Sequence, residues 1–165
     1  MKDKAVRKLA LQWLKRLDIP EGAIRVAIGD KEWREMGNRA RLSPHLGRVM
    51  DNGDGFGLAH YRTFPRERIA NAIVHEIAHI LWPSRPHWWV ECFAARLAPP
   101  CKDGPAGRYS RRYCHDVFEL PSRAECIRMA RKRAKGLFGS GPSHQEAPGD
   151  DFGARVVVDD LGFWV

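Results

Sequence analysis

The sequence of 165 residues lacks several features that would decide its class directly. No run approaches the ~20 consecutive apolar residues that a membrane-spanning helix needs. The first twelve residues are interrupted by charges, so they do not resemble a secretory signal. None of the four cysteines stands in a C-x-x-C pair. We therefore expect a cytoplasmic protein that does not enter a membrane and whose cysteines are reduced thiols.

Acidic residues are also in the minority. The chain holds 28 lysines and arginines against 20 aspartates and glutamates, which gives a formal net charge of +8. A basic surface attracts polyanions, so nucleic acid is a candidate partner. A solvated basic surface without any partner would give the same composition. The sequence leaves the oligomeric state unknown.

The N-terminal part of the chain predicts one helix and a small sheet. Apolar residues recur at helical spacing over residues 4–17. Residues 24–28 have the character of a strand, and residues 39–42, 47–50 and 57–61 can form further short strands. These segments predict an antiparallel or mixed sheet that follows an N-terminal helix.

The middle of the chain predicts two consecutive helices. The first begins near Pro65, since proline suits the first turn of a helix, and it stops before Pro83. The second runs from about His87 to Ala98. The connection between them is short, so we expect the two helices to pack antiparallel.

The last predicted helix is strongly basic. Ser122 and Glu125 form a capping-box pattern for a helix over residues 123–135, and Gly136 is expected to end it. Its arginines and lysines can face solvent or contact phosphates. The whole order of elements predicts the α+β fold class.

Composition divides the chain into a domain and a tail. Residues 1–138 carry the predicted helices and strands. Residues 139–150 are rich in glycine, serine and proline, which is typical of a flexible linker. Residues 151–165 form a C-terminal tail that ends in aromatic and aliphatic residues and can dock as a strand.

The chemistry of the chain is concentrated in the sequence His75-Glu76-Ile77-Ala78-His79. Residues four apart share one face of a helix, so His75 and His79 can both bind one tetrahedral zinc ion (Zn2+). Zinc lowers the pKa of a bound water to roughly 7, and Glu76 stands where its carboxylate can take the proton. A buried helix with two hydrogen-bonded histidines would produce the same pattern without a metal. The motif predicts a hydrolytic zinc site with Glu76 as the general base.

A catalytic zinc ion needs a third protein ligand and an open fourth position. His87 and Glu91 are the candidates, and they share one face of the second predicted helix because they are four residues apart. Antiparallel packing would bring that face over the first helix. We favour His87 as the ligand, with Glu91 as the alternative, and we expect the other residue to support the ligand.

Two family resemblances enter at this point. The sequence His75-Glu76-x-x-His79, followed by Pro86-His87, resembles the small SprT-like zincin metallopeptidases. That resemblance implies a zincin-like minimal metallopeptidase domain in which the histidine that opens the next helix completes the zinc site. Members of that wider group include proteases that act on proteins bound to DNA.

The second resemblance concerns the helix after the motif. The segment Phe93-Ala94-Ala95-Arg96-Leu97-Ala98-Pro99 is similar to the FAAxLLxP segment of the ImmA/IrrE-type metallopeptidases. Those enzymes cleave repressors and use a glutamate as the third ligand. This resemblance implies Glu91 as the ligand in place of His87.

The sequence therefore supports a main hypothesis and two others. The first is a zinc metallopeptidase that hydrolyses protein or peptide substrates, including DNA-associated or regulatory proteins. The second is a non-enzymatic DNA-binding or regulatory protein with a structural zinc site. The third is hydrolysis of a non-peptide amide, which the same chemistry permits.

Overall fold

The computed structural model describes residues 1–42, 45–99 and 121–139. Its sheet consists of β1 (Arg25–Ile28), β2 (Gly47–Val49) and β3 (Gly55–Leu58), in the order β1-β3-β2. β1 runs parallel to β3, with Val26 opposite Phe56, and β2 runs antiparallel to β3. The described part is thus an α+β fold with a small mixed sheet, as the sequence predicts.

Two of the predicted strands are confirmed and one prediction is wrong. Residues 24–28 and 47–50 contain β1 and β2, and the strand expected at 57–61 lies slightly earlier, as β3. No strand forms at 39–42. Main-chain carbonyl groups there accept hydrogen bonds from side chains. The Trp33 indole donates to the carbonyl of Ala40 at 2.7 Å, and Arg48 donates to that of Arg41 at 3.3 Å.

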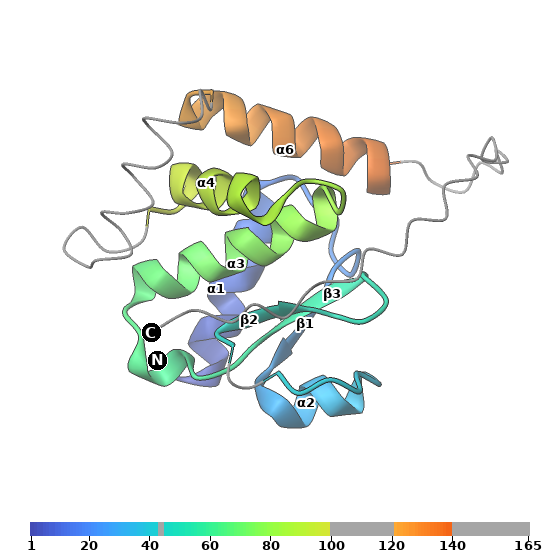
Figure 1. Ribbon diagram of the computed structural model, residues 1–165, viewed down its shortest axis with the longest axis vertical. Coiled ribbons are helices and arrows are strands. Elements are labelled where there is room, and N and C mark those ends of the chain that lie inside the picture. The colour runs from blue at the N-terminus through green and yellow to red at the C-terminus, as the bar shows by residue number, and fades with distance from the viewer. Residues whose placement is uncertain (43–44, 100–120, 140–165) are drawn as a thin grey trace, which may run out of the picture.

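A short helix that the sequence reasoning did not predict follows β1 directly. It is α2 (Gly29–Glu35), which lies beneath the sheet in Figure 1. The Glu32 carboxylate accepts a hydrogen bond from the main-chain N–H of Ile28 at 2.8 Å and pairs with Arg7. This carboxylate satisfies an N–H group at the helix start, where negative charge is favourable.

The sheet separates a large core from a small one. Val26, Ile28, Phe56 and Leu58 belong to the large core, which they form with the helices. The alternation of side chains along a strand sends Ala27 to the opposite face, where Trp33 and its neighbours form the small core. The helices of the large core begin with α1 (Asp3–Arg16), which is also the predicted N-terminal helix.

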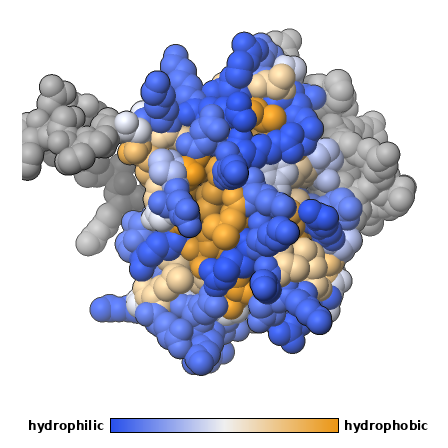
Figure 2. Space-filling model, turned by 180° about the vertical axis from the view of Figure 1, so that it is seen from behind, coloured by the Kyte–Doolittle hydropathy of each residue, from blue (hydrophilic) through white to orange (hydrophobic). Residues whose placement is uncertain are grey.

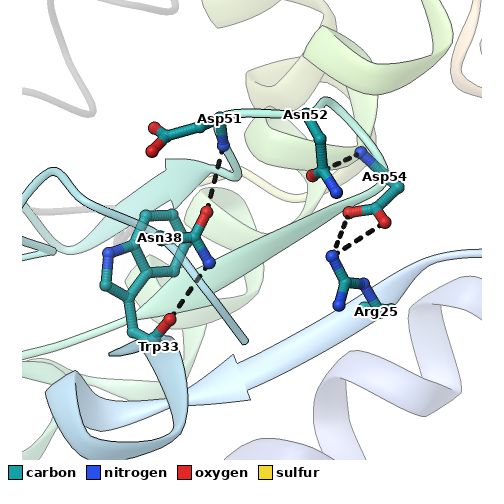
Figure 3. Close-up of polar contacts among 6 residues, drawn as sticks. All are labelled: Arg25, Trp33, Asn38, Asp51, Asn52 and Asp54. Carbon is teal, nitrogen blue, oxygen red and sulfur yellow. Dashed lines mark hydrogen bonds and ion pairs between the residues drawn. The ribbon is translucent and has the colours of Figure 1, made fainter. Parts of the chain in front are cut away.

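Polar contacts tie the small core to the loop between β2 and β3 (Figure 3). The buried Asn38 amide donates to the Trp33 carbonyl at 3.1 Å and accepts from the Asp51 main-chain N–H at 3.0 Å. The Asp54 carboxylate pairs with Arg25 of β1 at 2.8 Å. These contacts fix the β2–β3 hairpin, whose first strand borders the candidate site.

The remaining helices stack on the other side of the sheet (Figure 1). They are α3 (Arg66–Leu81), α4 (His87–Leu97) and α6 (Arg123–Phe138). The predicted capping box is present, since Ser122 and Glu125 each accept a hydrogen bond from the other's main-chain N–H. Gly136 does not end α6 as predicted, because Phe138 packs partly buried against the core and extends the helix.

The face of the molecule seen in Figure 2 is mostly polar. Figure 2 shows the rear face, where hydrophilic residues surround a narrow band of hydrophobic ones. Among the described residues, no helix is long and apolar enough to cross a membrane. The predicted linker, apart from Gly139, and the predicted tail over 151–165 lie outside the described residues.

Candidate metal centre

The turn between α3 and α4 brings the two predicted ligand helices together. Pro83 and Pro86 stand in this turn, and α4 begins at His87, directly after Pro86. Trp82, at the end of α3, packs edge-on against Trp89 and Phe93 of α4, with ring centroids 5.2 and 5.0 Å away. This aromatic packing holds α4 back against α3, as the short connection predicts.

Three imidazoles converge at this corner. The ring centroid of His75 lies 4.7 Å from that of His79 and 4.8 Å from that of His87. One ring nitrogen from each of the three lies within 4.8 Å of the other two. The Nε2 atoms of His75 and His79 are 3.1 Å apart, close to the separation of about 3.3 Å that zinc–nitrogen bonds of about 2.05 Å give in a tetrahedron. The three residues can therefore hold one metal ion.

The protonation of His75 and His79 suits metal binding. Burial, together with the neighbouring His79 and His87, holds the pKa of His75 well below its usual range. Burial and the nearby His87 lower the pKa of His79 to about 4. Both rings are therefore neutral near pH 7, which is the form that binds a metal. The His87 side chain is 56% exposed, so the group opens toward solvent.

Glu91 lies beside His87 and outside the group of three ring nitrogens. Its Oε1 atom is 3.5 Å from Nδ1 of His87. Burial raises the pKa of Glu91, and His87 opposes that shift. An imidazole whose Nδ1 faces a carboxylate can still bind a metal through Nε2. In many metal sites a carboxylate in that position orients the histidine ligand. The structure thus brings His75, His79 and His87 together, and Glu91 lies next to His87.

Glu76 is buried between α3 and strand β2. Its side chain is only 7% exposed, and the main-chain N–H of Val49 hydrogen-bonds the carboxylate. Burial raises the pKa of Glu76 to about 8, although the Arg48 charge and the Val49 hydrogen bond both lower it. A cation bound at the neighbouring histidines would favour the ionised carboxylate further.

Strand β2 contributes features that the sequence reasoning missed. A Cβ atom on Gly47 would lie 2.7 Å from Oε1 of Glu76 and 2.9 Å from its Cγ. Gly47 therefore leaves the space in which the carboxylate lies. No local pattern in residues 47–50 indicates a contact with residue 76, because the contact depends on how the hairpin packs on α3.

The cysteines differ from the sequence-based expectation. Cys92 of α4 is disulfide-bonded, so the expectation of four reduced thiols is wrong for this residue. Cys126 of α6 is free and buried. The expectation rested on the absence of C-x-x-C pairs, and that absence does not exclude a disulfide at other spacings.

Comparison with known proteins identified no relative. No family model, no curated protein and no solved structure matches the chain. The three histidines, Glu76 and their surroundings are therefore the basis for assigning a function.

Proposed function

We propose that this protein is a zinc-dependent metallopeptidase that uses His75, His79 and His87 as metal ligands and Glu76 as the general base. The convergence of three imidazole nitrogens on one point carries this proposal. The histidine at the start of α4 is also the ligand that the resemblance to SprT-like zincins implies. The ImmA/IrrE-type alternative, with Glu91 as the third ligand, has less support because Glu91 lies outside the group.

The donor set fits zinc in a catalytic role. Three imidazoles are a known catalytic ligand set, whereas structural zinc sites are almost always closed by four protein ligands. Among the residues that the structure describes, the metal-binding group contains three members. The exposure of His87 leaves room for water and substrate on the open side.

Bound zinc would supply Lewis acidity and lower the pKa of a water molecule to roughly 7. Glu76 takes a proton from the attacking water and later delivers it to the leaving amine nitrogen. The main-chain N–H of Val49 and the charge of Arg48 both favour the ionised form of Glu76 that accepts this proton. A structural zinc site has no need of a carboxylate buried at this position, which disfavours the non-enzymatic alternative.

The proposed substrates are proteins or peptides, and DNA-associated or regulatory proteins are the first to test. The net charge of +8 favours encounters with acidic partners and nucleic acid. The same chemistry extends to non-peptide amides, which a panel of small amide substrates would detect.

Metal removal provides the direct test. The purified protein, stripped with a chelator, is expected to bind one zinc ion per chain in calorimetry. Hydrolysis of casein and of DNA-bound protein should disappear with the metal and return on addition of one equivalent of zinc. Zinc binding without hydrolysis of any substrate by the wild type would favour the structural-zinc alternative. Absence of zinc binding would remove the metal site itself.

Replacement of Gly47 by alanine tests the arrangement around Glu76. The added methyl carbon would lie 2.7 Å from Oε1 of Glu76, so the carboxylate would have to move. A shift of ~1 Å in a catalytic group can lower the rate about 100-fold. We expect that loss in kcat/KM, with zinc affinity unchanged because the ligands lie on α3 and α4. Gly136→Ala is the matched control, since no atom lies within 4 Å of its Cβ position. Full activity of Gly47→Ala would show that the carboxylate does not need this position.

A further inference from the structure

The basic helix α6 makes one kind of contact three times. Arg131 donates from Nε and Nη2 to the carbonyl of Arg16 at 3.1 and 3.0 Å. Arg133 donates from Nε to the carbonyl of Leu81 at 2.8 Å, and Arg123 donates to that of Leu97 at 3.0 Å. The three acceptors are the last residues of α1, α3 and α4. A single helix thus caps the C-terminal ends of three others.

These contacts are favourable for a general reason. The last carbonyls of a helix have no partner within the helix and carry partial negative charge, so a cation that donates hydrogen bonds stabilises the end. Cys126, Ala130 and Ala134 lie fully buried along the inner face of α6. Two of these three side chains are alanine methyl groups, which lets α6 lie close to α3 and α4 (Figure 1). Composition alone would assign these arginines to solvent or to phosphates, but they donate hydrogen bonds to main-chain carbonyls of the protein itself.

The hydrogen bond of Arg133 differs from those of Arg123 and Arg131 in where its acceptor lies relative to the metal ligands. Leu81 stands two residues after His79 and directly before the turn over residues 82–86, which leads to His87. The bonds of Arg133 and Arg123 are partly buried, whereas those of Arg131 are exposed. Arg133 therefore holds the chain at the point where it leaves the helix that carries His75 and His79.

We propose that Arg133 is a positioning residue of the metal centre, which fixes the turn between α3 and α4 and so the distance of His87 from His75 and His79. This inference rests on the zinc site of the proposed function. Arg131 makes the same kind of bond at the end of α1, which carries no ligand. Arg123 acts at the far end of α4, ten residues after His87, or about 15 Å along the helix.

Arg133→Met tests the inference, with Arg131→Met as the matched control. Both changes keep an unbranched side chain and remove the donors and the charge. Zinc affinity is measured by competition with a fluorescent chelator, and the unfolding midpoint of the metal-free protein is measured in parallel. We expect Arg133→Met to bind zinc about tenfold more weakly, the lower end of the ~10- to 100-fold range for groups that support metal ligands. The zinc affinity of Arg131→Met should stay within about twofold of wild type. Both variants should have a lower unfolding midpoint than wild type.

The cobalt(II) complex gives a second readout. Its visible absorption reports coordination geometry, so Arg133→Met should alter the spectrum and Arg131→Met should not. If Arg133→Met does not fold, Arg133→Lys and Arg131→Lys replace the pair, since lysine keeps the charge without the guanidinium geometry. Equal zinc affinities and equal cobalt spectra in the two variants would overturn the inference. A wild type that fails to bind zinc would instead overturn the proposed function.

Discussion

Replacement of Glu76 by glutamine is expected to lower hydrolysis by about 100- to 10,000-fold, the usual contribution of a general base, while the fold and zinc binding persist. Glutamine has the same shape but cannot take a proton from water. Burial raises the pKa of Glu76 to about 8, so the metal-free carboxyl is mostly neutral near pH 7 and glutamine replaces it closely. Casein cleavage, calorimetric zinc binding and thermal unfolding give the three measurements.

Glu91→Gln is a suitable comparison for that experiment, because Glu91 is a second glutamate on a ligand helix and is partly buried. It should keep most of the activity at saturating zinc. Activity of Glu76→Gln above one tenth of the wild-type level would contradict the assigned role of the general base. If wild type and Glu76→Gln were equally inactive but both bound zinc, a structural role for the metal would be favoured.

The second large effect concerns the third ligand. His87→Ala is expected to weaken zinc binding by well over 100-fold, whereas Glu91→Gln should weaken it by about tenfold, as for an outer residue that orients a ligand. The expectation follows from the position of His87 within the group of three and of Glu91 at 3.5 Å from Nδ1 of His87. Zinc titrations of the two variants measure the difference directly.

His45→Ala provides a control for the loss of a histidine outside the group, and it should bind zinc like the wild type. A larger loss of affinity in Glu91→Gln than in His87→Ala would reverse the assignment. In that case the resemblance to the ImmA/IrrE-type enzymes would be the better guide to the site.

Local physical chemistry explains how much of the fold could be predicted. Helix α3 lies between Pro65 and Pro83, and its burial follows the apolar stripe in the sequence. The capping box at Ser122 and Glu125 is likewise a short-range pattern. The wrong predictions fall where side-chain contacts compete with the local pattern, as at Ala40 and Arg41, whose carbonyls accept from Trp33 and Arg48.

The charged residues likewise form contacts that the sequence pattern does not predict. Composition counts Arg123, Arg131 and Arg133 as surface charge, and nothing in their spacing indicates carbonyl groups as partners. Arg131 and its acceptor Arg16 are 115 residues apart in the sequence. Such bonds form only after the helices have packed, so a basic helix cannot be assigned to nucleic acid from its charge alone.

By itself, the sequence determined the helix that carries His75, Glu76 and His79, because i and i+4 positions share a face whatever surrounds them. It also limited the third ligand to His87 or Glu91. Only the tertiary structure placed His87 with the other two imidazoles, Glu91 at its Nδ1, and Gly47 against the Glu76 carboxylate. These positions depend on the turn between α3 and α4 and on the packing of β2, which arise from contacts between residues far apart in the chain.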